Sequence, residues 1–470
     1  MHTIEQIFIN GEFVTPHGTE RFDLYNPATA QVIGQVRLAD EVDAARAVAA
    51  AKAAFPAWSQ TTKQERIAAL KRMHAAVAAR HDELLEAVIE EYGAPASRSA
   101  WMASYPAEVI AQAIEALEAF EFVTPAGAAT VQMTPLGVAG LITPWNSDAG
   151  FICGKLAAAL AAGCTAVIKP SEMSALQTQI VTEALCDAAL PPGVFNIVTG
   201  RGETVGDTIS RHPDVAKISF TGSTHTGKAI LRNAAESFKR VTLELGGKSP
   251  TILLDDVDLA QAIPLVIQAG FMNSGQACVA GTRILVPYSR KAEIETALAQ
   301  AVAAVNSGDP RDKSTDVGPM VSAKQWQRVQ GYIRKGVEEG ARLLAGGEGR
   351  PEGTQDGWFV RPTLFADVNN QMTIARDEIF GPVLCVIPYR DEAEAIAIAN
   401  DTDYGLSAVV LGGADRARRV AQQIVSGRVL VNTLAHEPKA PFGGFKHSGV
   451  GREMGEWGIR AFMEPRSILG

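Results

Sequence analysis

The sequence predicts an α/β protein with doubly wound parallel sheets, and three features of its pattern support this fold class. From residue 136 onward, short apolar strands alternate with helical stretches, and the alternation restarts after residue 247. Residues 40–123 are rich in alanine with charged residues interleaved, which predicts several amphipathic helices. A β-α-β-α order is typical of parallel sheets. Because 470 residues are too many for one core, we expect two or three domains.

The individual elements follow from local periodicity and turn residues. Residues 7–37 are β-rich, and Asn10-Gly11 between two apolar runs predicts a hairpin. The strands expected after residue 136 are Val138–Ile142, Thr165–Lys169, Phe195–Val198, Lys217–Phe220, 249–254, 283–286 and 383–388. The helices expected there are 150–162, 174–189, stretches after Gly202 and Thr226, 258–271, 290–306, 322–339, 391–400 and 413–425. The residues expected to separate helices within 40–123 are Pro56, Gly93, Ala94, Pro95 and Pro106.

The composition argues against several classes of function. A net charge of −9 and a pI of about 5.5, without a long basic run, disfavour nucleic-acid and membrane-surface binding. The N-terminus lacks the pattern of a signal peptide, and the most apolar stretch, 151–168, is interrupted by Lys155. The five cysteines form no CxxC pair, so we expect neither a disulfide framework nor a metal site. These features predict a cytoplasmic protein in which a reduced thiol is available for chemistry.

A cysteine that follows a turn of small residues is the first candidate for catalysis. Cys278 comes after Asn273–Ala277, which itself follows a predicted helix. A turn exposes the thiol, and flanking backbone N–H groups can hold an anion beside it. The alternative is a structural cysteine, because free cysteine is among the most buried residue types.

An acid between two leucines and before two glycines is the second candidate. Apolar burial raises the pKa of a carboxyl group such as that of Glu244 toward the range of a general base. The two glycines allow close approach of the backbone or a positive φ. The alternative is a structural acid at the end of a strand, paired with Lys248.

Two further segments place polar groups after strands, where open α/β sheets bind ligands. Asn146 follows the strand 138–142, and its amide can donate to an oxyanion; the alternative is a turn asparagine beside proline. Glu172, with Lys169 beside it, can accept hydrogen bonds from ribose hydroxyls. The alternative there is a helix start that Ser171 caps.

Two weaker signals complete the set. Gly222-Ser223 lies between a strand and a helix, which is the usual setting for a pyrophosphate, although neither this turn nor 200–206 is a GxGxxG. Glu378 and Phe380 precede a strand and could hold a nicotinamide ribose and ring. A packed phenylalanine with a solvated acid is the alternative.

Taken together and in this order, these segments resemble the aldehyde dehydrogenase superfamily. The resemblance extends from Asn10-Gly11 to the C-terminal run 442–453 and so covers nearly the whole chain. It implies a Rossmann-like cofactor domain, an α/β catalytic domain and a small β oligomerisation arm. The expected boundaries are 1–116 and 136–246 for the cofactor domain, 247–446 for the catalytic domain, and 117–135 with 447–470 for the arm and C-terminal segment.

The resemblance also implies a role for each matching residue. Cys278 is expected to attack an aldehyde, Asn146 to hold the oxyanion with the backbone N–H of Cys278, and Glu244 to activate the water that hydrolyses the thioester. Lys155 is expected near the catalytic water and Glu453 in a proton relay. The implied cofactor contacts are Thr143, Trp145, Lys169, Glu172, Gly222, Ser223, Leu245, Glu378 and Phe380. NAD is the expected cofactor because Glu172 should repel the 2′-phosphate of NADP, although His225 could tolerate one.

Departures from the family pattern bear on the substrate. Ser147-Asp148 replaces an aromatic and a proline, and Gly154 replaces a bulky aromatic, which predicts a wider or more polar tunnel with Phe151 on one side. The positions expected to set specificity are Ser147, Asp148, Phe151, Gly154, Ala277, Val279 and the loop Thr433–Lys439. Apolar, aromatic and semialdehyde substrates all remain open.

Three alternatives compete with the hydrolytic aldehyde dehydrogenase that the resemblance implies. A CoA-acylating semialdehyde dehydrogenase often lacks the base that Glu244 provides here. A non-enzymatic relative would be expected to lose one of the three central residues, and a cysteine hydrolase would not need the cofactor motifs. The chain stops soon after Glu464, which predicts a short oligomerisation strand and leaves homodimer and homotetramer open.

Overall fold

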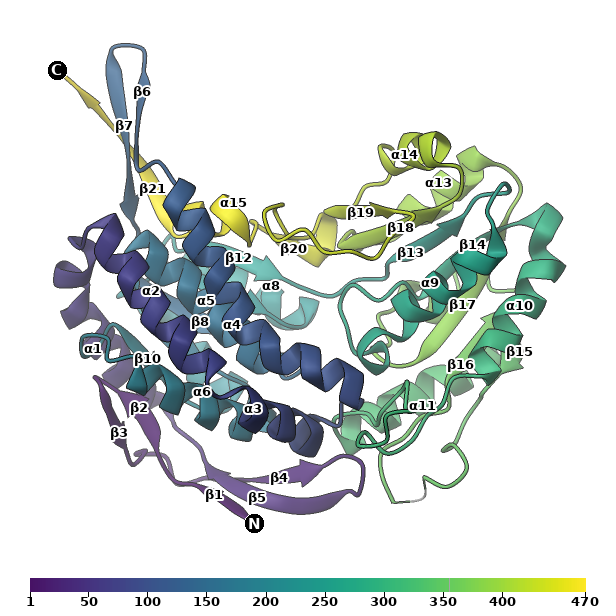
Figure 1. The fold of residues 1–470 in the computed structure, drawn as a ribbon, viewed down its shortest axis with the longest axis horizontal. Helices are drawn as coiled ribbons and strands as arrows, with labels where there is room; N and C mark the ends of the chain where they lie inside the picture. The colour runs from purple at the N-terminus through teal and green to yellow at the C-terminus, as the bar shows by residue number, and fades with distance from the viewer. Residues whose placement is uncertain (355) are drawn as a thin grey trace.

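Two large sheets with helices packed on them dominate the computed structural model, which describes residues 1–354 and 356–470 (Figure 1). The first sheet has eight strands: β2 (Ile7–Ile9), β3 (Glu12–Val14), β8 (Val138–Ile142), β9 (Thr165–Lys169), β10 (Phe195–Ile197), β11 (Val215–Thr221), β12 (Arg240–Glu244) and β20 (Gly449–Val450). Their order is β20-β12-β11-β8-β9-β10-β2-β3, and the five strands from β12 to β10 run parallel. The chain order reverses between β8 and β11, which is where sheets of this kind bind ligands.

The second large sheet has seven strands: β13 (Pro250–Leu253), β14 (Arg283–Pro287), β15 (Arg342–Ala345), β16 (Thr363–Ala366), β17 (Val383–Tyr389), β18 (Ser407–Leu411) and β19 (Arg428–Val431). Their order is β15-β16-β17-β14-β13-β18-β19. All neighbours pair in parallel except β15, which runs antiparallel along one edge.

Fifteen α-helices connect these strands in the described residues, and short 3-10 and π turns lie between some of them. They are α1 (Glu41–Ser59), α2 (Lys63–Ala78), α3 (His81–Ala87), α4 (Ala96–Ala119), α5 (Asp148–Ala162), α6 (Ala175–Asp187), α7 (Asp207–Arg211), α8 (Thr224–Ala235), α9 (Leu259–Phe271), α10 (Lys291–Ala303), α11 (Ala323–Glu338), α12 (Thr373–Arg376), α13 (Glu392–Asn400), α14 (Ala414–Ala421) and α15 (Gly455–Arg460).

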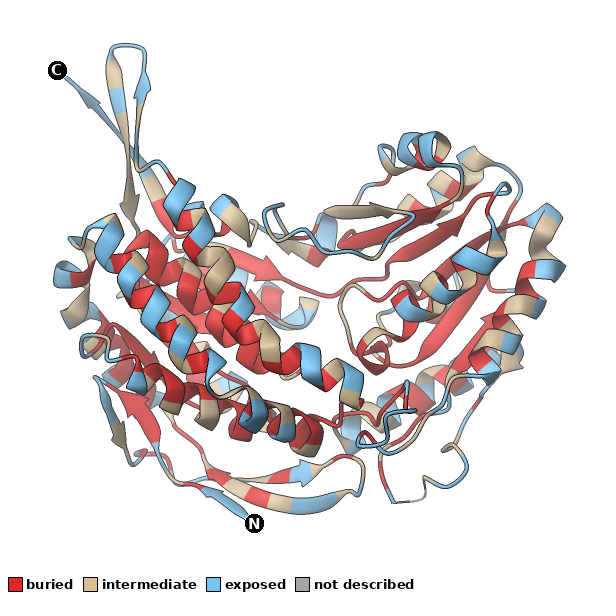
Figure 2. Cartoon of the chain, in the orientation of Figure 1, coloured by how far each residue is buried: buried red, intermediate tan, exposed pale blue. Residues whose placement is uncertain are grey.

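The side chains of the central strands alternate between two apolar layers, as strand geometry requires. On β8, Leu141 packs in the cluster with α2, α4 and α5, whereas Val138 and Ile142 pack in the cluster with α1 and α7. On β9, Ile168 and Val167 divide in the same way. Figure 2 shows these strands as buried along their length. Both faces of the sheet are therefore covered, which is why its strands read as continuous apolar runs.

Two small sheets lie outside these layers. One joins β1 (His2–Ile4), β5 (Gln31–Arg37) and β4 (Arg21–Asn26). The other joins β21 (Met463–Leu469), β7 (Ala129–Pro135) and β6 (Val123–Ala126), and it projects from the body of the molecule (Figure 1). Strand β21 pairs with β7 along all seven of its residues, so the expectation of a short strand was wrong. The three domain boundaries predicted above stay predictions.

The strands and helices predicted after residue 136 all occur, as does the hairpin β2–β3. Its turn residues have φ of 55° at Asn10 and 85° at Gly11, the positive values that a two-residue hairpin turn requires. The prediction that Pro56 and Pro106 separate helices was wrong, since they lie inside α1 and α4. A proline inside a helix costs about 3 kcal/mol, because it removes a hydrogen bond and clashes with a carbonyl group. In both of these long helices the burial of the apolar face outweighs that cost. Strands β12, β15, β16, β18 and β19 were not predicted.

None of the helices in the described residues is both long and apolar enough to cross a membrane.

A buried arginine joins the second sheet to the segment that follows Glu244. Arg283, on β14, is fully buried, and its Nε donates to the carbonyl oxygen of Lys248 at 2.9 Å. Its terminal nitrogens donate to the carbonyl oxygens of Ile398 and Ala399, also at 2.9 Å, in the last turn of α13. A cation suits the C-terminal end of a helix, where carbonyl groups have no partner within the helix.

Arg283→Met should therefore destabilise the protein, because it leaves three buried carbonyl oxygens without a donor. The expected loss is on the order of 3 kcal/mol or more. Thermal unfolding followed by circular dichroism measures it, with Arg418→Met as the control because Arg418 is exposed on α14. Equal melting temperatures for the two variants would contradict the role assigned to Arg283.

Candidate active site

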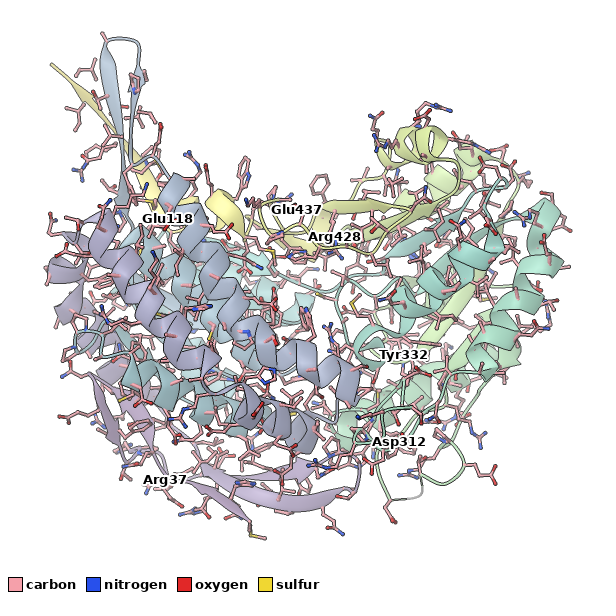
Figure 3. The ribbon with its side chains drawn as sticks, in the orientation of Figure 1. Arg37, Glu118, Asp312, Tyr332, Arg428 and Glu437 are labelled. Carbon is pink, nitrogen blue, oxygen red and sulfur yellow. The ribbon has the colours of Figure 1, made fainter. Side chains whose placement is uncertain are left out.

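A cavity of about 470 Å³ lies between the two halves of the molecule and is lined by residues from both. The four residues predicted to be catalytic, Cys278, Glu244, Asn146 and Lys155, all line it. Most of the remaining wall is apolar or aromatic. Figure 3 shows the side chains and labels Arg428, which reaches this cavity from β19. Concave, largely apolar sites with a few convergent polar groups are the usual form of a ligand pocket.

The nucleophile candidate follows a left-handed turn. After α9 ends at Phe271, the φ angles of Asn273, Ser274 and Gly275 are 54°, 58° and 74°. A Cβ atom at Gly275 would lie within 3.0 Å of the carbonyl oxygen of Gly381, so only glycine fits there. Non-glycine residues in this conformation are costly and persist where the surroundings hold them.

Hydrogen bonds to two other segments, one at 318–321 and one at Tyr92, hold this turn. The side-chain oxygen of Gln276 accepts from the N–H of Val321 at 3.0 Å, and its Nε2 donates to the Tyr92 hydroxyl at 3.3 Å. The Ser274 hydroxyl accepts from the N–H of Gly318 at 2.9 Å. The position of Cys278, two residues after Gln276, is thus fixed by the hydrogen bonds of neighbouring side chains rather than by its own contacts.

The two glycines after Glu244 allow the closest approach between the two large sheets. A Cβ atom at Gly247 would lie within 3.0 Å of the carbonyl oxygen of Cys278, and one at Gly246 would collide with the Glu378 carboxylate. Neither glycine has a positive φ. The sequence predicted that these two glycines serve either a close backbone approach or a positive φ. The close approach is confirmed, and the positive φ was wrong.

The carboxyl group of Glu244 is buried without a partner. Its residue is 3% exposed, and neither Oε1 nor Oε2 has a hydrogen-bond partner among the described residues. Burial, and then the charge of Glu453, raise the pKa of this carboxyl well above its ordinary value. The alternative of an ion pair with Lys248 was wrong, since Lys248 Nζ is also buried without a partner.

The thiol of Cys278 is half-buried, which disfavours the alternative of a fully buried structural cysteine. Burial, and then the charges of Glu378 and Glu244, raise the pKa of this thiol to about 12. The Arg428 charge and the Cys278 backbone N–H act in the opposite direction. At neutral pH the thiol is therefore protonated, and deprotonation requires a nearby base.

Asn146 is fixed next to the turn that carries the thiol. Its Nδ2 donates to the carbonyl oxygen of Gln276 at 3.0 Å, and its own carbonyl oxygen accepts from Asn273 Nδ2 at 3.0 Å. A side-chain amide carries two hydrogens, so one Nδ2 hydrogen remains for a ligand in the cavity.

Lys155 belongs to a polar cluster at the inner end of the cavity. Its Nζ is 2.5 Å from Glu453 Oε1 and donates to the Ser219 hydroxyl at 2.9 Å, and that hydroxyl also donates to Glu453 Oε1 at 2.9 Å. All three residues line the cavity together with Glu244. The cluster places a charged pair where protons from Glu244 could be received.

The predicted cofactor contacts lie at the carboxyl ends of the strands of the first sheet. Ser223 caps α8 by accepting from the N–H of Thr226 at 3.2 Å. Lys169 Nζ and Arg201 lie 3.2 and 3.4 Å from the two oxygens of Glu172. Although burial opposes them, these two cations keep the pKa of Glu172 below its ordinary value, so this carboxylate is charged.

The remaining predicted contacts surround the Gly246-Gly247 segment. Glu378 accepts from the N–H of Gly247 at 3.0 Å, and burial raises the pKa of its carboxyl to about 7. The rings of Phe380 and Trp145 meet edge to face at 5.4 Å. Leu245 is buried beneath the glycine at position 227, where a Cβ would collide with it.

Asp148 corrects one expectation about the substrate tunnel. Its carboxylate is fully buried and accepts from the hydroxyls of Thr143 and Thr178, at 2.5 and 2.9 Å. It therefore faces the interior of the protein, away from the cavity. The other expected positions do line the cavity: Ser147, Phe151, Gly154, Ala277, Val279, and Leu434 and His436 from the loop 433–439.

Sequence reasoning missed several residues of this site. Asn273 and Gln276 were read only as part of a small-residue turn, although they hold that turn in place. Arg98 and Arg428 line the cavity, and Arg201 pairs with Glu172. No periodicity or motif marks these three arginines, because their segments are distant in the sequence and meet only in the fold.

A thiol, a buried carboxyl and an amide donor thus line one cavity beside a doubly wound, Rossmann-like sheet. The model of the aldehyde dehydrogenase family matches residues 13–468, and the chain belongs to that family. It is 44% identical over 473 residues to the 3-succinoylsemialdehyde-pyridine dehydrogenase of a Pseudomonas species, covering 100% of this chain and 99% of that one.

Solved structures of the family share this fold. A mutant of aldehyde dehydrogenase C from Pseudomonas syringae, complexed with NAD+ and octanal, is 44% identical and superposes with a TM-score of 0.98, over 100% of this chain and 97% of that one. The aldehyde dehydrogenase of Mycobacterium tuberculosis complexed with NAD+ is 41% identical, with a TM-score of 0.96, over 99% of this chain and 98% of that one.

Glu453→Gln should shift the pH dependence of aldehyde oxidation to lower pH. A raised pKa keeps Glu244 neutral as pH falls, so the activity of a base declines on the acid side of the profile. The negative charge of Glu453 raises the pKa of Glu244, whereas the positive charge of Lys155, which is paired with Glu453, lowers it. Removing the Glu453 charge should therefore lower the pKa of Glu244. The measurement is kcat against pH, with the exposed Glu121→Gln as control. An unchanged or upward-shifted acid limb would rule out this coupling.

Proposed function

We propose that the protein oxidises an aldehyde to a carboxylic acid with NAD+, through a thiohemiacetal and a thioester on Cys278 that water activated by Glu244 hydrolyses. The observation that carries this proposal is the carboxyl group of Glu244, which is buried, has no partner, and shares one cavity with the thiol. A carboxyl of raised pKa at that position is suited to accept a proton near neutral pH.

The residues at the carboxyl edge of the first sheet fit a dinucleotide. The N-terminal end of α8, at Ser223, has N–H groups that suit a pyrophosphate. The charged Glu172 carboxylate suits the hydroxyls of a ribose, and the half-buried Glu378 lies where a second ribose could bind between it and Phe380. When bound, NAD+ supplies the acceptor for the hydride that leaves the aldehyde carbon.

The chain's own residues perform the remaining chemistry. Deprotonated Cys278 bonds to the carbonyl carbon, and the free Nδ2 hydrogen of Asn146 and the Cys278 N–H stabilise the oxyanion by about 3–4 kcal/mol per donor. After hydride loss leaves a thioester, Glu244 takes a proton from water as its oxygen attacks the acyl carbon. The C–S bond breaks, the sulfur is protonated again, and the acid departs. Lys155 and Glu453 would carry the proton away from Glu244.

The same site argues against the CoA-acylating alternative. A thiol acceptor of the acyl group needs no base to activate water, yet this chain buries a carboxyl group at considerable cost in the wall of the cavity. Relatives differ in the aldehyde: the Pseudomonas syringae mutant is complexed with octanal, whereas the Pseudomonas dehydrogenase is named for a succinoylsemialdehyde-pyridine.

Glu244→Gln should separate oxidation from hydrolysis. With a short aldehyde and NAD+ but no CoA, the variant should release about one equivalent of NADH per Cys278 and then turn over at least ~10²-fold more slowly than the wild type. Cys278→Ala should release none. Rapid-mixing absorbance at the NADH band measures both phases, with Glu121→Gln as the control.

Two results would contradict the proposal. Undiminished steady-state turnover of Glu244→Gln in water would exclude it as the base. Turnover of the wild type only after CoA is added would favour the acylating alternative.

Glu172→Gln should weaken the preference for NAD+ over NADP+. Its charge repels a 2′-phosphate, and its removal also frees Lys169 and Arg201 to attract one. We expect the ratio of kcat/KM for NADP+ to that for NAD+ to rise by about tenfold or more. The control is Glu236→Gln, an exposed acid at the end of α8. A ratio that stays at the wild-type value would remove Glu172 from cofactor selection.

The surroundings of the enzyme follow from two further features. All five cysteines are free thiols, which suits a reducing compartment, and we place the enzyme in the cytoplasm. The projecting arm exposes Val123, Ile468 and Leu469, so we propose that it joins copies of the chain as a homodimer or homotetramer. The acidic surface remains a poor fit for nucleic acid.

A further inference from the structure

Three arginines of the cavity, Arg98, Arg428 and Arg452, have no carboxylate partner in the described part of the chain, and only Arg452 donates to backbone carbonyl oxygens. Arg98, from α4, has a buried Nε without a hydrogen-bond partner, and its guanidinium lies 3.9 Å from the centre of the Trp101 ring. Arg428, from β19, donates one hydrogen bond, from Nε to the Ser407 hydroxyl at 3.3 Å. Arg98 and Arg428 are both half-buried, and charged side chains of this type are mostly exposed unless they are paired.

The other charges of the cavity are already satisfied or belong to the proposed hydrolytic machinery. Lys155 is paired with Glu453. Arg452 donates to the carbonyl oxygens of Gly444 and Gly451, at 3.1 and 2.6 Å. The carboxyl groups of the lining, Glu244 and Glu453, belong to the hydrolytic machinery. The wall of the cavity away from them therefore carries unbalanced positive charge.

Arg428 and the reacting thiol of Cys278 line the same cavity. The positive charge of Arg428 lowers the pKa of Cys278, and a negative charge on Cys278 raises the pKa of Arg428. Burial is the larger effect on Arg428 and lowers its pKa overall. Around Arg428 the wall is formed by Val409, Leu430 and other apolar side chains. Glu437, also labelled in Figure 3, accepts from the Lys439 N–H and forms no ion pair with Arg428.

We propose that the cavity accepts short aldehydes that carry a carboxylate at the other end, and that Arg428 binds this carboxylate. The terminal nitrogens of a guanidinium form a fork that matches a carboxylate, and apolar walls suit the methylenes between the two ends. Arg98, on its aromatic support of Trp101 and Tyr105, adds to the positive field. This inference rests on the proposed oxidation and names its substrate class.

The first experiment compares two aldehydes of equal size. Succinate semialdehyde carries the carboxylate, whereas 4-oxopentanal replaces it with a neutral acetyl group. The wild type should prefer succinate semialdehyde by about tenfold or more in kcat/KM. Arg428→Gln should reduce that preference to near unity, through a higher KM for succinate semialdehyde at little-changed kcat. Arg428→Lys should retain part of it, because it keeps the charge and loses the fork.

Arg418→Gln is the matched control, because it removes an exposed arginine from the same half of the molecule. If the wild type shows no preference, or if Arg428→Gln impairs both aldehydes equally, Arg428 is a structural cation over Phe442 and the proposal fails.

A second measurement does not depend on turnover. Iodoacetate and iodoacetamide alkylate the Cys278 thiol, and only the first is an anion. Mass spectrometry of the whole enzyme follows both rates at one pH, so that changes in thiol pKa cancel in their ratio. Arg428→Gln should lower the ratio of iodoacetate to iodoacetamide rates by about tenfold, by the same loss of a charge-assisted contact.

The two measurements separate the two claims. If neither aldehyde is oxidised but the alkylation ratio depends on Arg428, the anion site stands and the proposed oxidation fails. If both aldehydes are oxidised equally and the ratio is the same in wild type and variant, the oxidation stands and the anion site is overturned.

Discussion

The buried carboxyl group of Glu244 is the constraint on which the rest of the site depends. A carboxyl with no hydrogen-bond partner costs free energy that a protein retains only where function requires it. Glu244 ends strand β12, and the glycines that follow bring this strand end against the Cys278 carbonyl and the Glu378 carboxylate. Side chains at either glycine would separate the two sheets and open the cavity, so the local sequence fixes the distance between base and nucleophile.

Cys278 is held in place by a different feature, the turn that precedes it. The turn at Asn273–Gly275 holds a conformation that an isolated peptide would avoid, and bonds from Gln276 and Ser274 to distant segments maintain it. Neither Glu244 nor Cys278 is therefore placed by its own contacts. Both are placed by neighbours, which leaves the carboxyl and the thiol free to bind and transfer protons.

Much of this architecture could be predicted from the sequence, and the remainder has identifiable physical reasons. The strands β8 and β9 were predicted to the residue, because burial on both faces makes them continuous apolar runs between clear breaks. Strand β18 was missed although it is as long as β8 and β9 and is also buried throughout, whereas β19 has only four residues, all half-buried. Pro106 was misread because tertiary packing outweighed its local preference.

The site shows the same division between local and long-range information. Cys278, Glu244 and Asn146 each occur in a short segment whose neighbours signal a turn, a buried acid or a strand end. Asp148 was expected in the tunnel, yet it satisfies Thr143 and Thr178 in the interior. Arg428 could not be predicted, because its role depends on which segments the fold brings to one cavity.

The most direct test of this account is the protonation state of Glu244 in the resting enzyme. Difference infrared spectra between wild type and Glu244→Gln isolate the C=O stretch of that carboxyl, and a pH titration of the band reports its pKa. The account predicts a protonated carboxyl band at pH values well above 4.5, which disappears as the pH rises further, in agreement with the burial of both oxygens. A carboxylate signal that persists down to the ordinary pKa of a glutamate, near 4.5, would contradict it.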